Sequence, residues 1–144
     1  MVIQRQSAFN CPVKLAQPAL AVTVLYTAVR PTLGALRRAA SLARDLGASI
    51  RILNVRAVPY PLPLENPPTD REVLARNIRT LADGQAITTH IEICYGRDIV
   101  DSLLESLSPN SIVLIGVRRS WWPSRELRWA KKLTQCGHHV IVVG

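Results

Sequence analysis

The sequence is poor in acidic residues, aromatic residues and cysteines, and it has no long apolar run. It contains 10 Asp and Glu against 18 Lys and Arg, a formal net charge of +8. Its three cysteines are an odd number without a CxxC pair and follow no recognisable signal peptide, so we expect a reducing, cytoplasmic setting. The longest apolar stretch, residues 19–29, falls short of the roughly 18 to 20 residues of a membrane span. No membrane span is therefore expected.

Sequence motifs of catalysis are missing as well. The chain contains no GxSxG nucleophile turn, no GxxxxGK phosphate loop, no HExxH zinc motif and no paired-carboxylate arrangement. His138 and His139 are adjacent on an expected strand and would point to opposite faces, so they cannot chelate one metal ion together. We therefore expect a protein that is not an enzyme and that holds no metal.

The basic residues gather toward the C-terminal end. Residues 116–144 contain six Lys and Arg and the single acid Glu126. Such a cluster favours anionic partners, but basicity is also common for reasons of solubility. On this evidence we do not expect nucleic-acid binding.

What the sequence does contain is an alternation of short β-branched runs with amphipathic stretches. The apolar fraction is 48%, enough for the core of one domain of this length. Continuous apolar runs predict buried strands, and apolar residues at three and four residue spacing predict helices. The predicted strands cover 19–26, 49–58, 87–95, 111–117 and 139–143, and the predicted helices cover 31–46, 70–83, 98–107 and 125–135.

This order predicts the α/β class, with a doubly wound, five-stranded parallel sheet covered by helices on both faces, as in Rossmann-like folds. We place this domain at residues 19–144 and interpret residues 1–18 as an irregular N-terminal extension. Ligands of such sheets lie at the carboxyl ends of the strands. The loops after Tyr26, Val55 and Val117 are therefore the places where a ligand is expected.

The element order and several phrases resemble the universal stress protein family, over about residues 19–144. The phrase Ser-Ile-Val-Leu-Ile-Gly-Val-Arg-Arg at 111–119 is followed by a helix and by Val-Ile-Val-Val-Gly at 140–144. Leu-Arg-Arg-Ala-Ala-Ser-Leu-Ala at 36–43, Ile-Leu-Asn-Val at 52–55 and Tyr-Gly-Arg-Asp-Ile-Val at 95–100 also resemble the family. The resemblance implies the fold above and a homodimer in which the last strand pairs with its twofold mate.

The resemblance also implies a glycine motif for ATP, and this chain departs from it. ATP-binding members carry Gly, two residues, Gly, nine residues, Gly and Ser or Thr after the fourth strand, so that main-chain amides can approach the phosphates. Gly116 matches the first position, but Arg119, Trp129 and Ala130 stand at the others. The family's adenine-side aspartate is also missing, since 28–30 reads Ala-Val-Arg. We therefore expect no cofactor, and neither ATP nor AMP in the usual mode.

Two sets of candidate residues follow. The arginines after the fourth strand could grip a phosphate or carboxylate bidentately, and Trp is enriched at interfaces. The candidate ligand or anion site is Ala28, Val29, Val55, Gly116, Arg118 and Arg119, and the candidate interface is Trp121, Trp122, Trp129, His139, Val140, Ile141, Val142 and Val143.

Three functions remain open from the sequence. The first is a non-catalytic binding or signalling module, a homodimer through 139–143 that acts on an unidentified protein partner. The second is a domain that binds a nucleotide or phosphorylated metabolite through Arg118 and Arg119. The third is a regulatory domain of a larger transporter or sensor protein.

Overall fold

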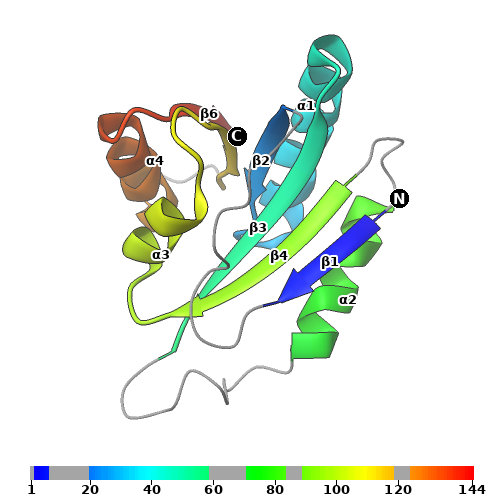
Figure 1. Cartoon of the computed structure of the whole chain (residues 1–144), viewed down its shortest axis with the longest axis horizontal. Coiled ribbons are helices and arrows are strands. Elements are labelled where there is room, and N and C mark those ends of the chain that lie inside the picture. The colour runs from blue at the N-terminus through cyan, green and yellow to red at the C-terminus, as the bar shows by residue number, and fades with distance from the viewer. Residues whose placement is uncertain (1, 7–19, 59–70, 84–88, 119–123) are drawn as a thin grey trace.

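Six parallel strands form one sheet, in the order β1-β4-β3-β2-β5-β6 (Figure 1). The computed structural model describes residues 2–6, 20–58, 71–83, 89–118 and 124–144. The strands are β1 (Val2–Gln6), β2 (Ala21–Leu25), β3 (Ser49–Ala57), β4 (Thr89–Gly96), β5 (Ile112–Gly116) and β6 (His139–Val143). Every neighbouring pair is parallel, so the carboxyl ends of all the strands lie at one edge of the sheet.

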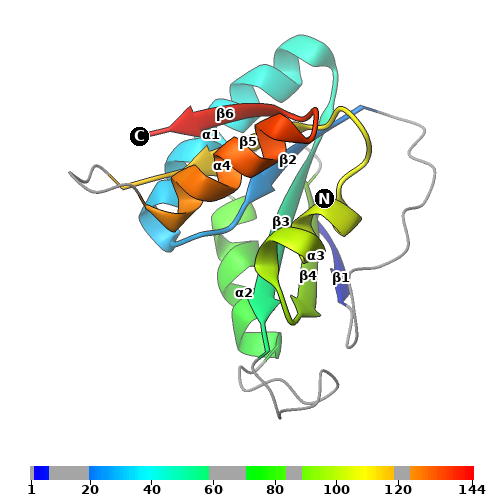
Figure 2. The same ribbon diagram turned by 90° about the vertical axis from the view of Figure 1, so that its left-hand side faces the viewer.

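Helices cover both faces of this sheet, as Figure 2 shows from the side. The helices are α1 (Val29–Leu46), α2 (Arg71–Ala82), α3 (Ile99–Ser106) and α4 (Arg125–Gln135). One apolar core lies under α1 and α2 and includes Leu36 and Ile78. A second core lies under α3 and α4 and includes Leu103 and Leu133. The doubly wound α/β architecture predicted from the sequence is thus confirmed.

The five predicted strands and four predicted helices all form, and one strand was missed. Val2–Gln6, part of the segment interpreted as an irregular extension, is β1 and pairs with β4 from Val2 opposite Thr89 to Gln6 opposite Ile93. That interpretation was wrong for these five residues, because an edge strand can be held by main-chain pairing without a clear apolar alternation. The rest of the predicted extension, residues 1 and 7–18, lies outside the described residues.

Local capping chemistry sets the ends of three helices. Gly47 ends α1 in the left-handed region at φ 63°, directly after the last residue of the helix predicted over 31–46. Asp98 caps α3 by accepting a hydrogen bond from the Asp101 amide at 2.9 Å. Ser124 caps α4 in the same way, through the Leu127 amide at 3.3 Å.

A buried ion pair joins β3 to β4. Arg51 Nη2 lies 2.5 Å from Glu92 Oε2, and the two side chains are only 9% and 10% exposed. Arg51 alternates along β3 with Ile50 and Ile52, which pack in the core under α1 and α2, so its side chain is on the α3 and α4 face. The Arg51 Nε atom is buried without a hydrogen-bond partner. Its buried positive charge is balanced by one carboxylate.

His138 connects the start of β6 to the segment that leads into β5. Its Nδ1 atom accepts a hydrogen bond from the Ser111 amide at 3.2 Å, and the residue is 8% exposed. His139, the next residue, is exposed. The two adjacent histidines therefore differ sharply in environment.

Replacing His138 with alanine is expected to cost about 1–3 kcal/mol of stability, because the Ser111 amide loses its acceptor and a buried side chain is removed. His139→Ala is the matched control, with an expected change below about 0.5 kcal/mol. Urea denaturation of the three proteins measures the difference. Equal midpoints for the two variants would contradict the structural role of His138.

Candidate functional site

The sheet reverses its strand order between β2 and β5, at the position where ligands bind in doubly wound folds. Here the exit of β2 is joined to the exit of β5 by Thr27. Thr27 Oγ1 donates to the Gly116 carbonyl at 3.1 Å, and the Thr27 amide donates to Thr32 Oγ1 at 3.1 Å. Thr32 is fully buried in the first turns of α1. The amino end of α1 is therefore held directly against the end of β5.

Gly116 is a glycine because of this contact. A Cβ atom built on Gly116 would overlap the main-chain carbonyl group of Pro31 and would lie 3.0 Å from Pro31 Cα. The obstacle is backbone in the first turn of a helix, which cannot swing away as a side chain can. Close approach of α1 thus explains the first position of the glycine motif without any ligand.

The next main-chain amide is already committed to the sheet. Val117 donates its N–H to the Val143 carbonyl at 2.8 Å, which continues the pairing of β5 with β6 by one residue. A phosphate at the end of β5 would have to break this bond to use that amide. The two residues at the β5 exit therefore offer no open main-chain cradle.

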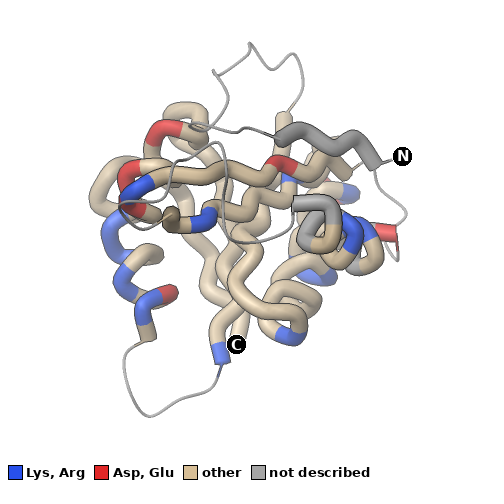
Figure 3. Tube along the Cα trace, turned by 90° about the horizontal axis from the view of Figure 1, so that it is seen from below, with Lys and Arg blue, Asp and Glu red and all other residues tan. Residues whose placement is uncertain are grey.

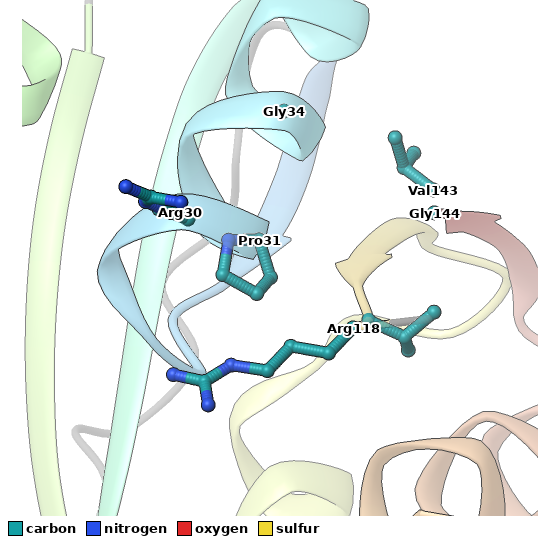
Figure 4. Close-up of a pocket in the computed structure, with 7 residues that line it drawn as sticks. Arg30, Pro31, Gly34, Arg118, Val143 and Gly144 are labelled. Atoms are coloured by element: carbon teal, nitrogen blue, oxygen red, sulfur yellow. The ribbon is translucent and has the colours of Figure 1, made fainter. Parts of the chain in front are cut away.

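Beside this contact lies a cavity of about 620 Å³. Figure 4 shows its lining, which comes from the start of α1, the exit of β5 and the end of β6. The lining residues are Arg30, Pro31, Gly34, Val117, Arg118, Val143 and Gly144. Arg30 and Arg118 are both exposed to solvent, and in Figure 4 the Arg30 side chain points away from Val143 and Gly144.

Solved structures of other proteins share this arrangement of strands and helices, although the sequence itself matches little. No protein-family model and no curated protein matches the sequence. A universal stress protein from Archaeoglobus fulgidus has a similar structure, with a TM-score of 0.58 and 15% identity over 87% of this chain and 93% of that chain. A universal stress protein solved in complex with cAMP has a TM-score of 0.56 and 16% sequence identity, over 88% of this chain and 97% of that chain. A member of the universal stress protein family from Burkholderia pseudomallei has a TM-score of 0.53 and 17% sequence identity, over 84% of this chain and 94% of that chain.

The chain has the universal stress protein fold. The resemblance stated from the sequence is thereby confirmed at the level of the fold. In this fold the described residues of the predicted ligand site come from several elements. Ala28 is the N-cap of α1 and Val29, its first residue, is 53% exposed. Val55 packs against the core under α3 and α4. Of the predicted ligand residues that the structure describes, only Arg118 lines the cavity, while Arg119 lies outside the described residues.

Sequence reasoning missed Arg30, Pro31 and Gly34 as site residues. Position 31 entered the prediction only as the first residue of the helix over 31–46, and Arg30 only as part of the missing aspartate position. Gly34 carried a usable signal, because glycine is less favourable than alanine inside a helix.

The predicted interface residues lie in two places. His139 and Val140 to Val143 form β6, which is the last strand of the sheet. Val142 is 43% exposed on it. Trp129 is half-buried on α4, with the Arg125 guanidinium 5.3 Å from its ring centroid, a cation–π contact. Trp121 and Trp122 lie outside the described residues.

Helix α4 carries most of the C-terminal positive charge. Figure 3 shows basic positions predominating along it, and Arg125, Arg128, Lys131 and Lys132 are all exposed. Partial burial acts to raise the pKa of the Glu126 carboxyl, but hydrogen bonds from its own main-chain amide and from the Arg125 and Ser124 side chains outweigh this and hold that pKa below its ordinary value. The one acid of α4 therefore stays ionised beside Arg125.

The described residues contain neither a metal-binding cluster nor a membrane-spanning helix. Within residues 2–6, 20–58, 71–83, 89–118 and 124–144, no group of three or more His, Cys, Asp or Glu side chains could hold a metal ion. Among the described helices, none combines the length and the apolar character needed to cross a bilayer.

Proposed function

We propose that this chain is a non-catalytic binding module that works as a homodimer through β6 and does not hold ATP by a glycine loop. The statement about ATP is supported by the closed exit of β5, by which we mean Gly116 and Val117 at the carboxyl end of that strand. Gly116 is in contact with the Pro31 main chain, and the Val117 amide is hydrogen-bonded to Val143. An ATP phosphate chain needs main-chain amides that are open and free of side chains, and these two positions supply none.

The edge of the sheet supports the homodimer. β6 pairs with β5 on one side, and within the described residues no strand pairs with its other side. The strand reads His-Val-Ile-Val-Val, and an apolar edge of this kind is a template for pairing with a second chain. Antiparallel pairing of two copies of β6 around a twofold axis would satisfy both edges at once. A protein partner, which remains unidentified, would then bind the dimer.

Replacing Val142 with lysine is expected to weaken the proposed homodimer. Val142 is 43% exposed in the single chain, so lysine adds a charge at the strand edge without disturbing the core. We expect the dissociation constant of the dimer to rise at least about tenfold, which corresponds to about 1.4 kcal/mol. Light scattering after size exclusion, across a concentration series, measures it.

The matched control is Leu127→Lys, which makes a comparable apolar-to-lysine change at a 41% exposed position of α4. This variant is expected to dimerise like the unmodified protein. A monodisperse monomer for the unmodified chain at all concentrations would refute the homodimer, and a dimer dissociation constant unchanged by Val142→Lys would place the interface away from β6.

A further inference from the structure

Helices α3 and α4 carry opposite charges on the same face of the molecule. They cover one side of the sheet and contact each other, and Figure 2 shows them as neighbours on the side turned toward the viewer. α3 contains no basic residue, and Glu126 is the one acid of α4. The exposed charged residues are Asp98, Asp101 and Glu105 at α3, and Arg125, Arg128, Lys131 and Lys132 on α4. An acidic helix therefore lies beside a basic one.

The charges of the two helices stand at the same spacing. The three acids occupy positions i, i+3 and i+7, which lie on one side of a helix. Arg125, Arg128 and Lys132 repeat this spacing on α4. We call the three acids the acidic stripe and these three bases the basic stripe. Each acid has a base at the matching position of the other helix.

The charges within each stripe are unfavourable for their own helix. Asp101 and Glu105 are like charges at i and i+4, and so are Arg128 and Lys132, and such pairs destabilise a helix. Glu105 lies in the last turn of α3, and Arg125 is the first residue of α4, so both oppose the helix dipole. Helix stability therefore does not explain the two stripes.

The stripes do not neutralise each other within one chain. Among the described residues the ion pairs are that of Arg51 with Glu92 in the sheet and that of Arg125 with its neighbour on α4. Four members of the stripes take part in neither, and these are Asp101, Glu105, Arg128 and Lys132. Their counter-charges have to come from dissolved ions or from another molecule.

Symmetry decides how a second copy of the chain would fit. α3 and α4 each connect two parallel strands on the same face of the sheet, so they run in the same direction. A twofold axis parallel to both helices and between them lays α3 of each copy on α4 of the other, and all four helices keep one direction. Acids then oppose bases at both contacts.

We propose that α3 and α4 form a docking surface for a second copy of this chain. Asp101 pairs with Arg128 of the second copy and Glu105 with Lys132 of the second copy, and each pair occurs twice because the contact is symmetric. Exposed ion pairs are individually weak, so we expect a dissociation constant on the order of 100 µM at about 50 mM NaCl. The surface lies on other elements than β6, so this proposal does not require the proposed homodimer.

The net charge of +8 makes the salt dependence of this contact diagnostic. Two copies of a basic protein repel each other, and salt screens that repulsion, so salt strengthens a contact that lacks complementary charges. Salt weakens a contact between opposite stripes for the same reason. Self-association that falls as the salt concentration rises therefore indicates a surface of complementary charge.

The experiment is sedimentation equilibrium of the purified full chain at about 50 mM and about 500 mM NaCl. The dissociation constant of the salt-sensitive step is expected to rise at least about tenfold at the higher concentration. Main-chain pairing of two apolar strands is not screened by salt, so the mass at high salt reports the β6 homodimer separately. Failure of this surface and failure of the homodimer are therefore distinguishable.

Charge-reversal variants locate the surface. Asp101→Lys and Arg128→Glu are each expected to weaken the salt-sensitive step at least about tenfold, because each brings like charges into contact. The double variant is expected to associate within about threefold of the unmodified chain, because the exchanged charges attract again. Arg37→Glu is the matched control, with the same change at an exposed position of α1 on the other face of the sheet, and should leave the affinity within about twofold.

Several results would overturn the proposal. One is a mass that does not fall between the two salt concentrations. Others are a salt-sensitive step that survives Arg128→Glu, a double variant that associates no better than the single variants, or an equal loss in Arg37→Glu. Absence of self-association, together with binding of a single-stranded DNA oligonucleotide that Arg128→Glu abolishes, would assign the basic stripe to nucleic acid instead.

Discussion

Gly116→Ala is expected to destabilise the protein by about 3 kcal/mol or more, near the upper end for overpacked sites. The added methyl group would overlap the Pro31 carbonyl group, and the first turn of α1 would have to move away from β5. That movement would also strain the hydrogen bond from Thr27 Oγ1 to the Gly116 carbonyl. Urea denaturation monitored by circular dichroism measures the loss.

Gly34→Ala is the control for this prediction. It is the same substitution in the helix that Gly116 contacts, but its methyl group would meet only Val143 at 3.9 Å. A gain of roughly 0.5–1 kcal/mol is expected from the better helix former. If Gly116→Ala were as stable as the unmodified protein, the close approach of α1 to β5 would be wrong.

Glu92→Gln is expected to cost about 3–5 kcal/mol, because it leaves the Arg51 guanidinium buried without a counter-charge. The Arg51 Nε atom has no hydrogen-bond partner, so nothing else on that atom compensates. A loss of this size is a large part of the total stability of a domain, typically about 5–15 kcal/mol. Chemical denaturation or the thermal midpoint measures it.

Two comparisons isolate the charge effect. Glu126→Gln makes the same change in an ion pair whose Arg125 side chain is 61% exposed, and it should cost less than about 1 kcal/mol. The double replacement Arg51→Met with Glu92→Leu should recover most of the stability lost by Glu92→Gln, because no unpaired charge remains. A double variant no more stable than Glu92→Gln would show that the pair acts through something other than its charge.

The parts of the fold that the sequence predicted are those that follow from local chemistry. Residues 112–116 read Ile-Val-Leu-Ile-Gly and form a central strand, and Gly47 stops α1, because buried parallel strands and left-handed caps constrain the residue types directly. β1 was missed, because its position depends on main-chain pairing with β4, 87 residues later at Thr89 opposite Val2. Main-chain pairing with a strand so far along the chain gives a five-residue segment little recognisable sequence pattern.

The candidate site was harder to predict than the fold, for a geometric reason. The sequence places Arg118 after a buried strand, but which helix it meets depends on how α1 crosses the end of β5. That crossing is fixed by the contact between Gly116 and Pro31, and it brings Arg30 and Gly34 to the same cavity. Gly116 itself was interpreted as the remnant of a phosphate loop, whereas its contact with Pro31 gives it a packing role.

Hydrogen exchange at the Val117 amide, measured by NMR with and without ATP, tests the closed exit of β5 most directly. The account predicts exchange at least about a hundredfold slower than for an exposed amide, before any nucleotide is added and unchanged by ATP, since Val117 donates to Val143 at 2.8 Å. Fast exchange in the unliganded protein, with protection that appears only when ATP binds, would contradict it.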